Sequence, residues 1–197
     1  MYNLHIFAST KIRNYIKTFE KLMLNAYLDI AGKWTIGYGS LDMPNGDPVK
    51  KSDKITNEEC EALFNADILT TEYAIKRYTN VGLNQNQFDA LVSFIFNCGS
   101  GAYQTSTLRK KINLQDFVGA GNEFVRWNKI FSPTKGKYIL SIGLTNRRKK
   151  EAEIFNTLPD IKIPINYLDN IKAKGLMLIS PKLPSHLILD PDLPYTL

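Results

Sequence analysis

The chain has 197 residues, which is enough for one domain with a small appendage. Hydrophobic residues make up 44% and aromatic residues 11% of it, so a packed core is expected and disorder throughout the chain is excluded. The formal net charge of +6 favours a polyanionic partner, such as nucleic acid, an anionic membrane or a cell-wall polymer.

The first predicted element is a helix that starts at Ser9 or Thr10, since either side chain can cap it. Its apolar residues recur at helical spacing: Ile12, Tyr15, Ile16, Phe19 and Met23. Glu20 follows Ile16 by one turn. Its carboxyl is therefore expected beside the apolar stripe rather than opposite it.

A β-hairpin is predicted next and a mostly helical body after it. Residues 27–29 and 34–39 have the pattern of two strands around a turn at 31–33. Thr56 and Glu59 form a capping box that opens one helix, and residues 84–87 open another that ends at Gly99. Shorter helices are expected farther along the chain, from about Ser106, Leu114 and Thr145.

The composition changes near Leu158, beyond which six of the nine prolines lie. This C-terminal segment is still rich in Ile and Leu, which is unusual for a solvated linker. We therefore expect a domain over residues 1–157 and a Pro-rich apolar extension over 158–197, packed as an extended arm.

Two carboxyls near the hairpin are candidates for acid–base chemistry. Glu20, beside apolar residues, should lose hydration, which favours the protonated form that a general acid needs. Asp29 lies next to a turn and should stay ionised, and the Thr35 hydroxyl across the turn could hold a water molecule. Glycoside hydrolysis needs two carboxyls with such different environments. Most Glu and Asp pairs are ordinary surface charges, so the spacing alone leaves that alternative open.

Residues 19–39 strongly resemble the phage-type lysozymes, the endolysins of glycoside hydrolase family 24. The catalytic pattern of that family is Glu, eight residues, Asp, five residues, Thr, and Glu20, Asp29 and Thr35 match each spacing. Four further blocks resemble the family in the same order: 83–99, 106–108, 126–129 and 143–151. The resemblance covers about residues 9–157.

The resemblance implies a lysozyme-like α+β fold, with a small N-terminal β-hairpin lobe, a larger helical lobe and the active-site cleft between them. It implies hydrolysis of the β-1,4 bond between N-acetylmuramic acid and N-acetylglucosamine in bacterial peptidoglycan, without a cofactor or a metal. Glu20 would be the acid, and Asp29 with Thr35 would manage the water. Inversion of the anomeric centre is expected, which requires carboxyls about 6.5–9.5 Å apart.

Four further residues are candidates for substrate binding. Gly37 and Gly39 would let the glycan approach the backbone, or else only permit a bend in the strand. Asn97 and Gln104 are weaker candidates for sugar contacts, and Asn97 has the alternative role of capping a helix end.

The sequence also departs from the family. Many relatives carry His where Ser40 follows Gly-Tyr-Gly, so any charge pair made by that His is absent. Residues 130–138 differ from the glycine-rich loop of many relatives, which puts the shape of the cleft there in doubt.

The remaining reactive residues favour structural roles. Cys60 and Cys98 are expected as buried thiols, although the sequence does not rule out a disulfide. His5 and His186 lie at the two extremes of the chain, which disfavours a histidine triad or a zinc site. The basic runs at 109–111 and 147–150 are typical of a solvated helix face. A pairing of Arg147 or Arg148 with Glu20 remains open.

Two rival functions have to be weighed against hydrolysis. One is a non-catalytic peptidoglycan-binding protein, and the other is a basic membrane-disrupting protein. Nucleic-acid binding is disfavoured because no recognition motif accompanies the charge. No run of 18 apolar residues and no secretory signal occurs, so we expect no stable membrane insertion. The protein is expected to be a monomer. It would stay in the host cytoplasm until a holin-type lesion releases it to the periplasm and cell wall.

Overall fold

The computed structural model describes residues 2–29, 32–158, 161–164 and 187–190. The chain divides into two units, Met1–Asn156 and Thr157–Leu197, which are described separately. In the second unit, β5 (Ile161–Pro164) and β6 (Leu187–Asp190) pair in parallel. The rest of the predicted C-terminal arm lies outside the described residues.

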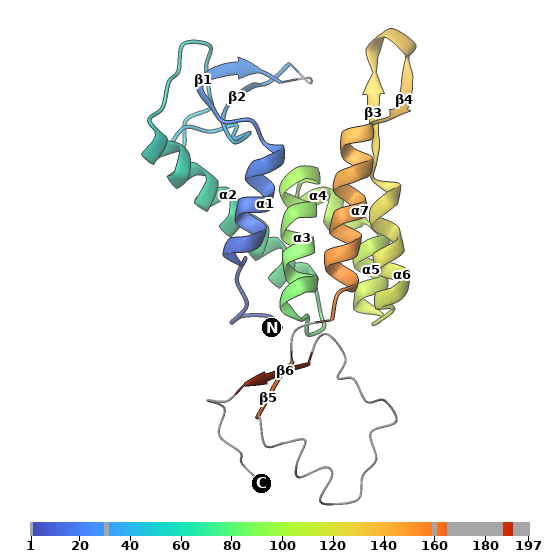
Figure 1. Cartoon of the computed structure of the whole chain (residues 1–197). Coiled ribbons are helices and arrows are strands. Elements are labelled where there is room, and N and C mark those ends of the chain that lie inside the picture. Colours follow the sequence, from blue (N-terminus) through green and yellow to red (C-terminus); the bar gives the residue numbers. More distant parts are fainter. Residues whose placement is uncertain (1, 30–31, 159–160, 165–186, 191–197) are drawn as a thin grey trace, which may run out of the picture. The chain divides into compact units, whose positions relative to one another are not determined.

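The first unit begins with a helix and a hairpin (Figure 1). Helix α1 spans Thr10–Phe19, and the Ser9 side chain caps it by accepting a hydrogen bond from the Ile12 amide. Strands β1 (Met23–Leu28) and β2 (Trp34–Gly37) pair antiparallel. Both the capped helix and the hairpin are confirmed, although β1 begins four residues earlier than the sequence pattern indicates.

A long helix connects the hairpin to the helical body. Helix α2 (Asn57–Tyr78) opens with the predicted capping box of Thr56 and Glu59. Helix α3 (Gln85–Cys98) opens with a second capping box and ends at Gly99, whose φ of 86° lies where glycine is favoured. The remaining α-helices and strands of this unit are α4 (Ser100–Thr105), α5 (Thr107–Asn113), α6 (Phe117–Glu123), β3 (Lys129–Ser132), β4 (Lys137–Leu140) and α7 (Ile142–Asn156).

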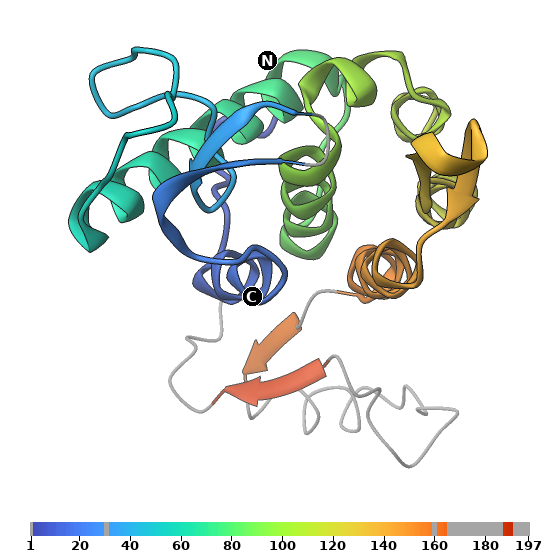
Figure 2. The same ribbon diagram turned by 90° about the horizontal axis from the view of Figure 1, so that it is seen from above.

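Helix α3 is the centre of the larger hydrophobic core, and α1, α2 and α7 surround it (Figure 2). Its Phe88, Leu91, Phe94 and Ile95 are buried among side chains from the neighbouring helices. A smaller core joins the hairpin to the start of α2 and contains Ile36, Val49, Ile55, Cys60 and Leu63. The fold is therefore lysozyme-like α+β, with a hairpin lobe and a larger helical lobe, as expected.

Two elements of the helical lobe were not predicted. Helix α4 is a single short helix of six residues between Gly99 and Ser106. The β3–β4 hairpin occupies the segment in which the sequence departs from its relatives, with Phe131 opposite Tyr138. Helix α7 begins at Ile142, three residues earlier than expected. Within the described residues, no helix is both long enough and apolar enough to cross a membrane.

Candidate active site

The β1–β2 hairpin places the predicted water-handling residues on one face. Tyr27 and Thr35 are direct cross-strand partners, so their side chains lie on the same face of the hairpin. Asp29 follows Tyr27 by two positions, at the start of the turn. Both functional groups are tied to Lys33: its amide donates to Asp29 Oδ1 (2.8 Å), and its carbonyl accepts from Thr35 Oγ1 (3.1 Å). The turn therefore fixes the separation of Asp29 and Thr35.

Glu20 lies at the C-terminal cap of α1, where its amide still donates to the Ile16 carbonyl. Its side chain is 22% exposed, and Oε1 accepts a hydrogen bond from Arg147 Nη1 at 2.6 Å. The carboxyl is thus partly desolvated, as the sequence suggested, and Arg147 fixes its direction.

Arg147 belongs to a buried group on α7 and α3 that we call the α7 charge cluster: Ser93, Arg147, Arg148 and Glu151. Glu151 Oε1 accepts from Ser93 Oγ (2.6 Å), Arg148 Nη2 (2.8 Å) and Arg147 Nε (3.2 Å). Arg148 Nε also lies 2.8 Å from Glu151 Oε2. The solvated face expected for residues 147–150 is therefore wrong for its first two arginines, because Glu151 compensates their charge inside the protein.

Tyr27 links the two candidate carboxyls. Burial raises the pKa of its phenol, and the negative charges of Glu20 and then Asp29 raise it further. An interaction of this kind requires both carboxyls to lie close to the same hydroxyl group. Glu20 and Asp29 are therefore both near enough to the Tyr27 hydroxyl for their charges to raise its pKa.

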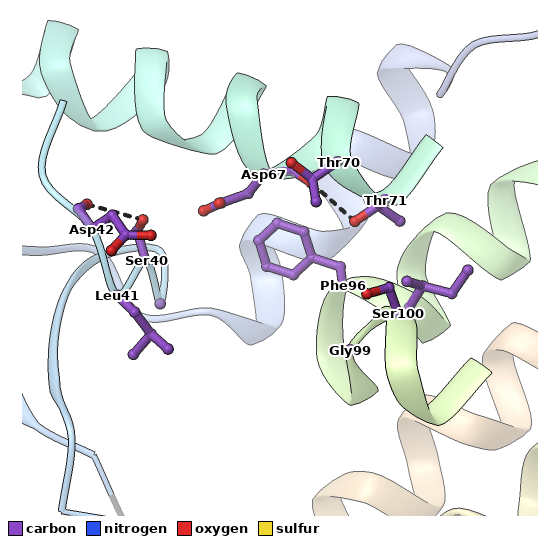
Figure 3. A pocket seen from close by; sticks show the side chains of 11 residues that line it. Ser40, Leu41, Asp42, Asp67, Thr70, Thr71, Phe96, Gly99 and Ser100 are labelled. Carbon is purple, nitrogen blue, oxygen red and sulfur yellow. Dashed lines mark hydrogen bonds between the residues drawn. The ribbon is translucent and has the colours of Figure 1, made fainter. Parts of the chain in front are cut away.

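A cavity of about 360 Å³ lies where the segment after β2 meets α2, α3 and α4 (Figure 3). Gly39, Leu41 and Phe96 contribute to its lining, so one of the predicted substrate-binding residues borders it. Glu20, Asp29 and Thr35 are not part of this lining. The case for the catalytic residues rests on the hairpin geometry and the Glu20–Arg147 pair instead.

Asp67 of α2 points toward the loop that carries Ser40 and Asp42 on the same cavity (Figure 3). Burial raises the pKa of its carboxyl, the nearby Asp42 charge adds to this, and the Ser40 hydroxyl offsets part of it. The folded state therefore holds the Asp67 proton more tightly than the unfolded state does. The stability that this provides is lost as pH rises through the folded-state pKa. Ionised Asp67 therefore destabilises the folded state at neutral pH.

The substitution Ser40→His should stabilise the protein in a limited pH range. An imidazolium beside Asp67 would favour the ionised carboxylate, and the resulting gain should be about 1–2 kcal/mol. The gain requires an ionised Asp and a protonated His, so it should be present near pH 5.5 and lost as pH rises through the raised imidazole pKa. Urea unfolding at pH 5.5 and 8.5 tests this, with Ser40→Asn as the uncharged control. An equal change at both pH values would contradict it.

Gly37 is buried at the end of β2 with a φ of 66°, and an added Cβ would lie 3.2 Å from Cys60 Sγ. The left-handed backbone alone should make Gly37→Ala lower the free energy of unfolding by about 1–2 kcal/mol. The close contact of the new Cβ with Cys60 should lower it further. Gly32→Ala is the matched control, because Gly32 has a φ of 76° but open space around it. Turnover per folded molecule at low temperature tests the predicted glycan contact: a backbone-only role would leave it unchanged.

A second cavity, of about 690 Å³, separates the end of α3 from the β3–β4 hairpin. Asn97 lines it together with Trp127 and Tyr138. Trp127 also packs edge-on against Phe94, with ring centroids 5.3 Å apart, so its ring serves the core as well. Gln104 is exposed on α4 and does not line either cavity. The four predicted substrate-binding residues therefore do not converge on one place.

The two cysteines are free thiols. Cys60 is buried as expected, but Cys98 is only half-buried, and its Sγ accepts a hydrogen bond from Arg148 Nη1 at 2.9 Å. Among the residues that the structure describes, no group of three or more His, Cys, Asp or Glu side chains is arranged to hold a metal ion.

Comparisons with known proteins show the family of the chain. Residues 17–151 match the sequence model of the family described as phage lysozyme. An endolysin of Acyrthosiphon pisum secondary endosymbiont phage 1 is 40% identical over 142 residues, which is 72% of this chain and 92% of the relative.

Solved structures show the same similarity. An endolysin from Escherichia coli O157:H7 phage FAHEc1 superposes with a TM-score of 0.69 at 43% identity, over 77% of this chain and 94% of that one. The muramidase domain of SpmX from Asticaccaulis excentricus superposes with a TM-score of 0.68 at 30% identity, over 78% of this chain and 99% of that one.

Proposed function

The chain belongs to the phage lysozyme family and is a peptidoglycan-degrading glycoside hydrolase, and from that premise we propose that Glu20, Asp29 and Thr35 carry out the reaction. The bond cleaved is the β-1,4 linkage between N-acetylmuramic acid and N-acetylglucosamine. The observation that carries the proposal is the hairpin geometry, in which Lys33 holds both the Asp29 carboxylate and the Thr35 hydroxyl.

Each residue has a role that its surroundings support. Protonated Glu20 donates its proton to the leaving glycosidic oxygen, and Arg147 fixes the direction of that carboxyl. Asp29 accepts a proton from a water molecule as the water attacks the anomeric carbon from the opposite face. Thr35 Oγ1 donates to Lys33, which leaves its lone pairs free to accept a hydrogen bond from that water.

We expect the reaction to invert the anomeric centre, because a water molecule has to fit between the substrate and Asp29. The carboxyls of Glu20 and Asp29 should then lie about 6.5–9.5 Å apart, instead of the about 5 Å of a retaining enzyme. Gly39 and Asn97, on the two cavities, are the substrate contacts that the geometry supports best.

Product analysis tests this function directly. Purified sacculi digested with the protein should release muropeptides with a reducing N-acetylmuramic acid end, and early NMR spectra should show the α-anomer. An anhydro-sugar, lighter by one water, would instead identify a lytic transglycosylase. Sacculi that bind the protein but release no muropeptide would identify a non-catalytic binding protein.

The biological setting follows from the substrate. We propose that the protein acts as a monomer on the cell wall of a host bacterium during lysis, and that it leaves the cytoplasm through a holin-type membrane lesion. Expression in a host with and without a co-expressed holin tests the route of release. Lysis that does not depend on the holin would contradict it.

A further inference from the structure

Arg147 donates hydrogen bonds to two carboxylates through different nitrogens of its guanidinium. Its Nη1 donates to Glu20 Oε1 at 2.6 Å, and its Nε donates to Glu151 Oε1 at 3.2 Å. Its Nη2 donates to the Ser93 carbonyl at 3.2 Å, which ties the guanidinium to α3 as well. These three hydrogen bonds fix the planar guanidinium, which also lies 5.1 Å from the centre of the Phe19 ring.

The far side of this arrangement is closed to solvent. Glu151 and Arg148 are 0% exposed and Arg147 is 3% exposed. Arg147 and Arg148 carry two positive charges, and Glu151 supplies one negative charge inside the cluster. Glu20 supplies the second negative charge from the edge of the site. The two arginines and the two glutamates together are therefore neutral only when Glu20 is ionised.

Other groups also face the cluster. From α1, the Tyr15 hydroxyl is buried without a hydrogen-bond partner among the described residues, and burial followed by the Glu151 charge raises its pKa to about 12. From α3, Cys98 lies against Arg148. The charge of the exposed Glu153 on α7 also raises the Tyr15 pKa, and the charges of Glu20 and Asp29 both raise the pKa of Tyr27 on the hairpin.

We propose that Glu151, held by Ser93 and Arg148, is a positioning residue that orients Arg147 toward Glu20. Its negative charge also offsets enough of the positive charge of Arg147 for Glu20 to carry a proton. A buried guanidinium with Glu20 as its only counter-charge would hold the acid in its ionised form, which cannot protonate a leaving group. This inference rests on the proposed role of Glu20 as the general acid.

The pH dependence of kcat/KM on soluble peptidoglycan fragments tests the inference. In Glu151→Gln, the pH at which activity falls on the alkaline side should move down by roughly one unit, because a negative charge near Glu20 is removed. Glu151→Asp keeps the charge and should retain the wild-type profile. Glu153→Gln is the matched control on the exposed side of α7, where Glu153 pairs with Lys150, and should not move the profile.

The outcome can be separated from that of the proposed function. If Glu20→Gln is inactive while Glu151→Gln keeps the wild-type pH profile, the inference fails and the function stands. If Glu151→Gln does not fold, carboxyl ¹³C NMR of the wild-type protein decides: Glu151 has to remain ionised over the pH range in which Glu20 titrates. A Glu151 that is already protonated there would overturn the inference.

Discussion

Replacing Glu20 with Gln should lower kcat/KM by roughly 100- to 10,000-fold, the range usual for loss of a general acid. The amide keeps an oxygen that can accept the hydrogen bond from Arg147, so the fold should survive. What is lost is the proton for the leaving oxygen. A turbidity assay on outer-membrane-permeabilised cells, together with kinetics on soluble fragments, measures the effect.

The matched control is Glu61→Gln. Glu61 is also a carboxylate paired with a cation, Lys17, but on an exposed part of α1 and α2. Its replacement should leave clearing unchanged. Equal clearing by wild type and Glu20→Gln would mean that the site is wrongly assigned, and if killing persisted without muropeptide release, a membrane-disrupting mode would be the better explanation.

Replacing Arg148 with Met should destabilise the protein by about 3–5 kcal/mol, because it leaves Glu151 buried without its closest counter-charge. Arg148 is completely buried, contacts both oxygens of Glu151, and lies 5.1 Å from the centre of the Phe94 ring. For a folded unit of this size, the melting temperature should fall by roughly 10 °C. Calorimetry or thermal circular dichroism measures it.

Two further variants define the cause of this loss. Lys149→Met changes the exposed neighbour and should have little effect on stability. The double variant Arg148→Met with Glu151→Leu removes both buried charges and should recover much of the lost stability, since apolar side chains can replace a buried ion pair. If the double variant were as unstable as Arg148→Met alone, the cost would come from lost packing and not from the uncompensated carboxylate.

The sequence did not predict that the α7 charge cluster is buried. It left open a pairing of Arg147 or Arg148 with Glu20, and the structure shows this pairing for Arg147. A run of two arginines and two lysines followed by a glutamate has the composition of a solvated helix. One available signal is the i, i+3 and i, i+4 spacing of Glu151 from Arg148 and Arg147, which allows intrahelical pairs. That spacing does not reveal burial, because exposed helices use the same pairs.

The β3–β4 hairpin was missed for a different reason. Its register sets Lys129 opposite Leu140 and Phe131 opposite Tyr138, and these four residues are all exposed. The other face carries the half-buried Ile130 and Ile139, so apolar residues lie on both faces. The hairpin therefore lacks the apolar alternation by which strands are recognised in a sequence. Only its pairing, and Gly136 with a φ of 58° in the turn, make it a hairpin.

The local elements and the spacing of the candidate residues Glu20, Asp29 and Thr35 were determined by the sequence alone. The Ser9 cap, the Thr56–Glu59 box and the Gly99 stop depend on neighbours within a few residues, and so does the spacing from Glu20 to Thr35. The pairing of Glu20 with Arg147 joins residues 127 positions apart, and it exists only because α1 and α7 both pack against α3. The tertiary structure therefore decided the surroundings of the Glu20 carboxyl, since burial and counter-charge depend on which distant segments meet.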